Sequence, residues 1–480
     1  MALHEDELFA RLDGFRSGDL DTKGGRTWAY VYDPGRADID RIAKRALVEF
    51  HDTNALDPTV FPSLLHLENE VVGLARDHLR GDDAVVGSFT TGGTESIMLA
   101  VKAARDRARE LRPEVTRPTM VLPVTAHAAF HKAAHYFDVE AVSVPVDTTT
   151  WKADVDAMAD AVDDRTILLV GSAVSYAHGV VDPIPELGRL ALERDVLLHV
   201  DGCIGGFVLP HFRRLGREVT DFDFSVPGVT SISMDFHKYA YCPKGASVVL
   251  YRDASLRRHQ LYAKAAWTGY TVINTTIQST KSGGALAATW AVLNYVGDEG
   301  YLEIAQRTLD AVDAIRSGIE SVPDLEVMGS PESNLIALSS DSVNVFDVVD
   351  EMRTHRWYVQ PQLGFAGSRE NIHLSVGGAS LALVPELLED LRAACDAARA
   401  RPTPPADDEI VALLHSLDPA TLGPDEFDLL LAGAGIGGDG AGPEVPERTA
   451  GINAILNVCP PELAERVLVE FFNRIFVPPT

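Results

Sequence analysis

A lysine, an aspartate and a glycine-rich turn are the residues of this sequence whose types and spacing could do chemistry together. Lys238 lies in SISMDFHKYAYCPKG (Ser231 to Gly245), where a short apolar run leads into a loop. A lysine held near a cationic ring loses its proton more easily and can attack an aldehyde. Most lysines are solvated surface charges, so Lys238 is significant only together with the other two features.

The aspartate is Asp201, which ends the apolar run VLLHVD. In an open α/β sheet, ligands bind at the carboxyl ends of the strands. A carboxylate there can keep a proton on a pyridine nitrogen, so that the ring stays cationic and accepts electrons from a bond broken next to it. By itself, an aspartate at the end of a strand is more often a turn or capping residue.

The glycine-rich turn is TTGGTES, Thr90 to Ser96, and it opens a stretch with apolar residues at helical spacing. Gly92 and Gly93 let backbone N–H groups approach a phosphate, Thr94 adds a hydroxyl, and the helix dipole favours the negative charge. A plain strand-to-helix turn explains this motif alone equally well. The order of phosphate turn, strand-end aspartate and lysine 37 positions later (238 minus 201) predicts a pyridoxal phosphate site.

The elements expected to position these residues are alternating strands and helices. Between about residue 85 and residue 255, apolar runs such as TMVLPV, TILLVGSA and GASVVLYR alternate with helical stretches, which is typical of βα units and a parallel sheet. After residue 300, a helix and the strand candidates LEVMG, NLIALSS and ENIHLSV predict a smaller α+β region. The expected division is an arm over residues 1–60, a large cofactor-binding domain over 61–300, a small domain over 301–400, a linker over 401–447 and a helical tail over 448–480.

The composition argues against several classes of function. The formal net charge is −28, from 42 basic and 70 acidic residues, and such a chain is repelled by a phosphate backbone or an anionic membrane surface. The first residues contain no apolar signal region, and no apolar run is long enough to span a bilayer. Four cysteines without CxxC spacing favour a reduced, cytoplasmic setting. We therefore expect a small amino substrate, no nucleic acid and no stable membrane insertion.

Several motifs resemble consecutive landmarks of the sphingosine phosphate lyases, within the broader group II family of pyridoxal-dependent decarboxylases. They are TTGGTESIMLAVKAARD, AHAAFHKAAHYFDV, GSAVSYAHGVVDPI, HVDGCIGGFVLP and SISMDFHKYAYCPKGASVVLYRD, and they occur in this order. The resemblance extends from about residue 50 to residue 400. It implies an aminotransferase-like type I fold and a homodimer with both active sites at the subunit interface.

The resemblance also implies residue roles. Lys238 would form the Schiff base with the cofactor, Asp201 would face its pyridine nitrogen, and His127 would stack on its ring. The other implied cofactor-binding residues are Gly93, Thr94, His237 and, in a stretch that the family contributes from the neighbouring subunit, Ser279 and Thr280.

The cofactor alone does not choose the reaction, because the bond that breaks is the one held perpendicular to its ring. A retro-aldol lyase needs a base for the proton of a β-hydroxyl and releases an aldehyde, whereas a decarboxylase needs an acid that reprotonates the α-carbon. His178 and Tyr239 are the candidates for these proton transfers. By resemblance we expect retro-aldol cleavage of a phosphorylated β-hydroxy amine, with amino-acid decarboxylation as the alternative.

The residues expected to bind substrate are Lys244, Asp57, His178 and Tyr239. Lys244 matches a lysine that the lyases use for the substrate phosphate. Asp57 in NALDPTVFPS replaces a family histidine, and a carboxylate would repel a phosphate dianion. Lys281 in place of an arginine, and the residues Tyr270 to Asn274, also depart from the family pattern. A non-phosphorylated β-hydroxy amino acid, or an amino acid that loses its carboxylate, therefore stays an alternative substrate.

Other patterns point to different functions. His127, His131 and His135 recur at helical spacing, as in a metal site, but no acidic or thiol ligand accompanies them, and we predict no metal. GAGIGG, residues 433–438, has the dinucleotide spacing GxGxxG without a helix after it, which favours a loop. An aminotransferase would need a carboxylate clamp, for which Arg369 is the candidate. A non-catalytic scaffold would have no need for the lysine and the strand-end aspartate together.

Overall fold

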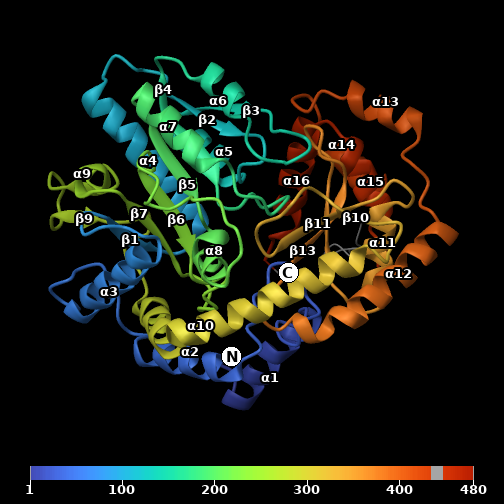
Figure 1. Ribbon diagram of the computed structural model, residues 1–480, viewed down its shortest axis with the longest axis horizontal. Helices are drawn as coiled ribbons and strands as arrows, with labels where there is room; N and C mark the ends of the chain where they lie inside the picture. The colour runs from blue at the N-terminus through green and yellow to red at the C-terminus, as the bar shows by residue number, and fades with distance from the viewer. Residues whose placement is uncertain (1, 434–446, 479–480) are drawn as a thin grey trace.

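A seven-stranded sheet forms the large domain of the computed structural model, which describes residues 2–433 and 447–478 (Figure 1). The strand order is β1-β7-β6-β5-β4-β2-β3. β7 runs antiparallel to both of its neighbours, whereas all other neighbouring pairs are parallel. The strands are β1 (Val86–Thr90), β2 (Thr119–Pro123), β3 (Glu140–Val144), β4 (Thr166–Ser172), β5 (Leu197–Asp201), β6 (Ser231–Asp235) and β7 (Ser247–Tyr251). The expected α/β class and mostly parallel sheet are confirmed.

Helices cover both faces of this sheet, which is why its central strands are apolar runs buried on both sides. One face packs against α3 (Pro62–His78), α7 (Ile184–Arg194), α8 (Gly205–Arg214) and the first part of α10 (Gly283–Ile319). The other face packs against α4 (Gly93–Leu111) and α5 (Ala129–Phe137). Since side chains alternate along a strand, the polar residues at the ends of β5 and β6 share the face of α4. These residues are His199, Asp201, Ser233 and Asp235.

A smaller antiparallel sheet, with the order β10-β11-β13-β12, forms the small domain. Its strands are β10 (Glu326–Val327), β11 (Leu335–Ser339), β12 (Gln360–Gln362) and β13 (Asn371–Ser375), and α11 (Val345–Thr354) and α12 (Val384–Ala400) share its core. The N-terminal arm joins this domain, because the Trp28 side chain is buried in that core. The backbone N–H of Trp28 donates to the backbone carbonyl of Tyr358 over 2.8 Å. The arm is therefore part of the packing of the small domain.

Helix α10 joins the two domains and passes below both in Figure 1. It packs against α2 (Ala37–Glu49) and breaks at Gly297, whose φ of 62° and ψ of 178° are non-helical. Glycine adopts a positive φ without the steric penalty of a side chain. Residues up to Leu309 belong to the large-domain core, and residues from Ala311 belong to the small-domain core. The two domains thus share one helix, whose break lies near the expected boundary at residue 300.

The remaining elements before residue 400 are short or peripheral. They are α1 (Glu5–Phe15), η1 (Arg16–Gly18), α6 (Val155–Ala161), α9 (Ala254–Arg257), the hairpin of β8 (Tyr262–Lys264) and β9 (Val272–Asn274), and η2 (Leu381–Leu383). Among the helices within residues 2–433 and 447–478, none combines the length and the apolar character needed to cross a membrane.

The C-terminal segment contains more helix than expected. Within the stretch predicted as linker, α13 (Asp408–Ser416) and α14 (Pro424–Gly433) form, and α15 (Ala450–Val458) and α16 (Pro461–Ile475) follow. The acid-rich sequence supplies a helix cap, because the Asp407 side chain accepts the N–H of Glu409 at the start of α13. All but the first residue of the GAGIGG motif lie outside the described residues.

Asp350 of α11 anchors this segment to the small domain. Its buried carboxylate accepts the N–H groups of Thr449 and Ala450 over 2.9 and 2.8 Å, which caps the first turn of α15. Arg448 extends the contact, with Nη1 2.7 Å from the carboxylate of Glu351. These polar contacts to α11 dock the start of α15, together with Ala450, which is buried in the small-domain core.

An Asp350→Ala variant should lose this cap. We expect the free energy of unfolding to fall by about 1–3 kcal/mol, because the buried N–H of Ala450 and the partly buried donors of Thr449 lose their acceptor. We also expect faster limited proteolysis near residue 447. Glu389→Ala, which removes an exposed carboxylate from α12, is the matched control and should behave as the unmodified protein. Equal proteolysis rates for the two variants would show that Asp350 does not hold the segment.

Candidate active site

A cavity of about 580 Å³ lies where β4, β5 and β6 end, on the α4 face of the large sheet. The sequence predicts cofactor-binding residues in five separate motifs, and residues from four of them line this one cavity, whereas Ser279 and Thr280 of the fifth do not. The predicted residues in its wall are Gly93, Thr94, His127, Asp201, His237 and Lys238.

The predicted phosphate turn begins helix α4, with Gly92 as the N-cap. Glu95 fixes this turn, because its Oε2 accepts the N–H and the hydroxyl of Thr91 over 2.8 and 2.9 Å. Its other oxygen accepts the backbone N–H groups of Ile277 and Gln278 over 3.0 and 3.2 Å. The first N–H groups of a helix have no partner within it, so this helix start offers donors to an anion.

Gly93, the first residue of α4, allows the close approach that such a site needs. A Cβ atom at this position would lie 2.7 Å from Cys203 Sγ and 2.9 Å from the carboxylate of Asp235. Only glycine fits without displacing one of them. The turn therefore fits a phosphate group that sits directly against the backbone.

Asp201 presents one free carboxylate oxygen to the cavity. Its Oδ1 accepts the N–H of Cys203 over 3.0 Å and the hydroxyl of Ser233 over 3.3 Å. No donor within residues 2–433 and 447–478 is bonded to Oδ2. Behind it, burial lowers the pKa of His199 to about 4, so that ring is neutral and bonds to Ser231 and Ser233. Asp201 is thus suited to bind a protonated ring nitrogen.

Lys238 forms an ion pair with Asp235, the last residue of β6. The Nζ atom lies 2.9 Å from Asp235 Oδ2, and Asp235 is only 1% exposed. Burial disfavours the ammonium form, but the carboxylate outweighs burial and raises the pKa of Lys238. Burial also raises the pKa of Asp235, yet Lys238 and His237 more than offset it and lower that pKa. The lysine is therefore held as an ammonium by Asp235.

Asp235 was not among the predicted site residues. It ends β6 in the way that Asp201 ends the neighbouring β5, and this shared position was the signal available in the sequence. The neighbouring His237 lies 3.6 Å from the same carboxylate oxygen, and burial lowers its pKa.

His127 lies just before α5 with its ring exposed to the cavity. Its Nδ1 accepts the N–H of Ala129 over 3.1 Å, so in the neutral ring the proton is on Nε2. This bond fixes the orientation of the ring next to the helix start. The other two histidines of the repeat, His131 and His135, do not line the cavity.

A wall of tyrosines that the sequence did not predict closes another side of the cavity. Tyr30 and Tyr32 come from the N-terminal arm, Tyr176 follows β4, and Gln360 belongs to the small domain. The Tyr176 hydroxyl donates to Gln360 Oε1 over 2.5 Å. Burial raises the pKa of Tyr32 and of Tyr176, so both hydroxyls are protonated and can donate.

Two of the predicted substrate residues lie behind this wall. Lys244 Nζ is 4.4 Å from the ring centre of Tyr32, and partial burial together with the charge of Lys238 lowers the pKa of Lys244 to about 8. Tyr239 is buried, with its ring 5.1 Å from that of Tyr32. Neither residue lines the cavity itself.

The other two predicted substrate residues lie further away. His178 is 1% exposed, stacks on Trp151 with ring centres 4.4 Å apart, and lies within hydrogen-bond distance of the Ser368 hydroxyl at 2.9 Å. Asp57 is on the surface, where it accepts the N–H of Thr59 over 2.8 Å before α3 begins. In a single chain, neither side chain reaches the cavity.

The stretch assigned to a neighbouring subunit is exposed. Ser279 and Thr280 lie outside the cavity lining of their own chain. Lys281, which replaces a family arginine, is buried, and its Nζ lies 2.8 Å from a carboxylate oxygen of Glu68. Arg369, the clamp of the aminotransferase alternative, pairs with Asp341 and Glu326 and does not line the cavity.

Family models match most of the chain. The model described as the pyridoxal-dependent decarboxylase conserved domain matches residues 32–340. A second model, described as the C-terminal putative HTH domain of pyridoxal-dependent enzymes, matches residues 408–474, which contain α13 to α16.

Individual relatives agree with these models. The sphingosine-1-phosphate lyase of Arabidopsis thaliana is 39% identical over 369 residues, which is 76% of this chain and 66% of the plant protein. The chain thus spans about two thirds of that relative. The solved sphingosine-1-phosphate lyase of Burkholderia pseudomallei is 36% identical with a TM-score of 0.79, covering 83% of this chain and 92% of the other. A probable L-tyrosine/L-aspartate decarboxylase of Methanothermobacter thermautotrophicus is 32% identical, over 66% of this chain and 85% of the relative.

These matches confirm the expected resemblance, the type I fold and the pyridoxal cofactor. The region matched by the first model contains the glycine turn, the strand-end aspartate and the lysine that meet at the cavity. Sequence similarity and site geometry therefore lead to the same assignment, and the chain belongs to the pyridoxal-dependent decarboxylase family.

Proposed function

We propose that the protein is a pyridoxal-phosphate-dependent carbon–carbon lyase that cleaves a β-hydroxy amine, phosphorylated or not, to an aldehyde and an amine. The observation that supports the reaction class most strongly is the similarity to sphingosine-1-phosphate lyases, at 39% and 36% identity across most of the chain. The arrangement of Lys238, Asp201 and His127 around one cavity agrees with this proposal.

Each residue of the cavity has a separate task in the proposed reaction. Gly93, Thr94 and the start of α4 hold the phosphate of the cofactor, and the free oxygen of Asp201 holds the proton of its ring nitrogen. His127 covers the ring. Pyridoxal phosphate, when bound, supplies an aldehyde for the lysine and a ring that accepts electrons from the broken bond. Lys238 provides the amine, and Asp235 raises the pKa of that amine.

Proton transfer to and from the substrate needs further groups. Tyr239 and His178 remain proposals for this role, although both lie outside the cavity wall of a single chain. Tyr32 and Tyr176 are additional candidates because their protonated hydroxyls border the cavity. Lys244 and Asp57 are proposed to set the preference at the phosphate end of the substrate.

We also infer that the protein works as a homodimer in the cytoplasm. Large apolar side chains between residues 262 and 277 are about half exposed in a single chain, among them Trp267 and Tyr270. A second subunit would bury them and bring Ser279 and Thr280 toward its own cavity. The four described cysteines are free thiols, as expected in a reducing compartment.

Decarboxylation of an amino acid is the second candidate reaction. It is favoured by the similarity to the probable L-tyrosine/L-aspartate decarboxylase, which is covered over 85% of its length. The surface carboxylate of Asp57, which would repel a phosphorylated substrate, points in the same direction. Aminotransfer is a weaker candidate because Arg369 lies outside the cavity.

The first test follows both products at once. Purified holoenzyme is incubated with phosphorylated sphingoid bases and with a panel of amino acids, and release of aldehyde and of carbon dioxide is measured in parallel. We expect aldehyde without carbon dioxide. Lys238→Ala should abolish turnover, because among the described residues no other lysine lines the cavity to supply the amine. Lys132→Ala, an exposed lysine on α5, should leave turnover unchanged. Carbon dioxide without aldehyde would assign the protein to the decarboxylases instead.

Asp235→Asn tests the control of the lysine proton. Lys238 must lose a proton before it attacks an aldehyde, and Asp235 raises its pKa. The rate of cofactor capture by the apoenzyme should therefore rise with pH, and this rise should move to lower pH in the variant because burial then dominates. Stopped-flow absorbance after addition of pyridoxal phosphate measures the rate. An unchanged pH profile would remove Asp235 from this role.

Asp57→His tests the phosphate end of the substrate. Replacing a carboxylate by an imidazole removes repulsion of a dianion, so kcat/KM for phosphorylated substrates should increase by about tenfold, or ~1.4 kcal/mol. Asp82→His is the matched control, because Asp82 is also exposed and accepts a nearby backbone N–H, that of Ala84. Identical kinetics for the two variants would place Asp57 outside the substrate site.

A further inference from the structure

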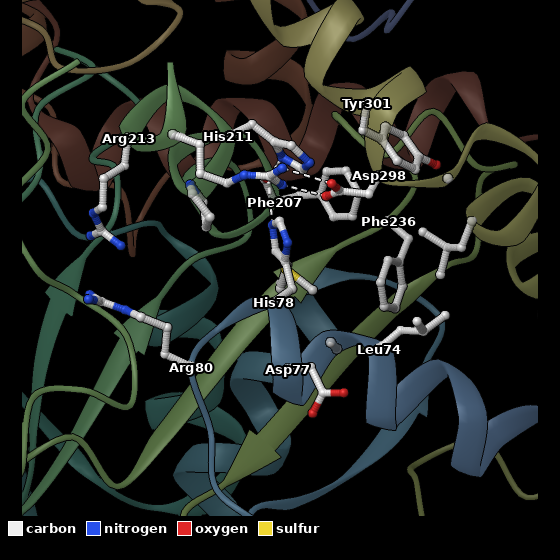
Figure 2. A pocket seen from close by; sticks show the side chains of 16 residues that line it. Leu74, Asp77, His78, Arg80, Phe207, His211, Arg213, Phe236, Asp298 and Tyr301 are labelled. Carbon is white, nitrogen blue, oxygen red and sulfur yellow. Dashed lines mark hydrogen bonds and ion pairs between the residues drawn. The ribbon is translucent and has the colours of Figure 1, made fainter. Parts of the chain in front are cut away.

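A second cavity of about 480 Å³ lies on the face of the large sheet opposite to the active site (Figure 2). It is lined by the C-terminal halves of α3 and α8 and by α10 on both sides of its break at Gly297. Met234 of β6 also faces it, since this residue alternates with Ser233 and Asp235 along the strand. Most of the wall is apolar, with Leu74, Phe207, Phe236, Leu293 and Tyr301.

Two histidines, His78 of α3 and His211 of α8, lie next to each other in the wall of this cavity, with ring centres 4.8 Å apart (Figure 2). His78 Nε2 lies 2.8 Å and His211 Nδ1 lies 3.0 Å from the same backbone carbonyl, that of Phe207. A carbonyl only accepts hydrogen bonds, so both of these nitrogens carry the proton.

The remaining nitrogen of each ring is a hydrogen-bond acceptor. Burial lowers the pKa of His211, and it lowers the pKa of His78 to about 4, so both rings are neutral. A neutral imidazole has one donor and one acceptor. The acceptors are therefore His78 Nδ1 and His211 Nε2, and no donor within the two described ranges is bonded to either. Both residues line the cavity and neither nitrogen is enclosed, so each can accept a hydrogen bond from a molecule in the cavity.

The charges around the cavity are already compensated. Arg214 makes a two-pronged ion pair with Asp298, with Nη2 2.7 Å from Oδ2. Arg80 Nε and Arg213 Nη1 lie 2.8 and 3.3 Å from Oδ2 of Asp223. An ionic ligand would have to break one of these pairs, so the cavity suits a neutral molecule.

We propose that this cavity binds a neutral, mainly apolar small molecule that donates hydrogen bonds from a hydroxyl or N–H group to His78 Nδ1 and His211 Nε2. The cavity volume lies in the range of small-molecule sites, which are mostly apolar with a few polar groups that orient the ligand. This site is separate from the active site and does not rest on the proposed reaction.

Phenol and toluene are suitable probes, because they have similar shape and differ in one hydroxyl donor. Isothermal titration calorimetry of the holoenzyme should show phenol bound at one site per chain and roughly three- to tenfold more tightly than toluene. His211→Phe should reduce this difference, since it deletes one of the two acceptors and leaves His78 Nδ1. Binding of neither probe at millimolar concentration, or equal affinity for both in the unmodified enzyme, would overturn the proposal.

A pair of tryptophan variants locates the bound probe. Leu293→Trp fills the cavity from α10 and should abolish phenol binding. Asn294→Trp adds the same side chain at the next, exposed position of that helix and should leave binding unchanged. Retained binding in Leu293→Trp would place the probe elsewhere and contradict the assignment. The absorbance of the bound cofactor verifies that each variant is folded, and His211→Phe tests the same site independently.

Discussion

The ion pair between Lys238 and Asp235 is the interaction on which the rest of the active site depends. A carboxylate that is 1% exposed pays a large desolvation penalty and persists only with a compensating partner. Lys238 is that partner at 2.9 Å, and β6 holds the carboxylate between β5 and β7. The lysine is thereby fixed beside Asp201 and the start of α4 before any cofactor is present. The pair also keeps the amine protonated, and an ammonium group cannot attack an aldehyde.

The charge of Lys238 also influences Lys244, which lies behind the cavity wall. Lys244 packs against Tyr32, and partial burial together with the charge of Lys238 lowers its pKa to about 8. Any step that removes the charge of Lys238 also removes one cause of this lowering. Lys244 then holds its proton more firmly and attracts an anionic group more strongly. The protonation of the two lysines is therefore coupled.

The sequence was sufficient for the residues that lie at the ends of strands or the start of a helix. Gly93, Asp201 and Lys238 follow apolar runs, and parallel strands bring such positions to one edge of a sheet. Tyr30 and Gln360 could not be predicted, because they reach the cavity through packing of the arm and the small domain, and no local pattern records such contacts. The helices α13 and α14 were missed for a related reason: proline and glycine indicated a loop, whereas capping and docking stabilise helix there.

Strand β6 shows how one short segment serves two faces. Ser233 and Asp235 belong to the active-site face, and Met234 belongs to the second cavity, because consecutive side chains of a strand point in opposite directions. The alternation is readable in the sequence, but the second cavity is not. It lies where α3 and α8 meet α10 at the break at Gly297, and His78 and His211 contribute to its wall. Three helices meet here and leave a space between them. Local sequence patterns do not record such a space, so it is seen only in the folded chain.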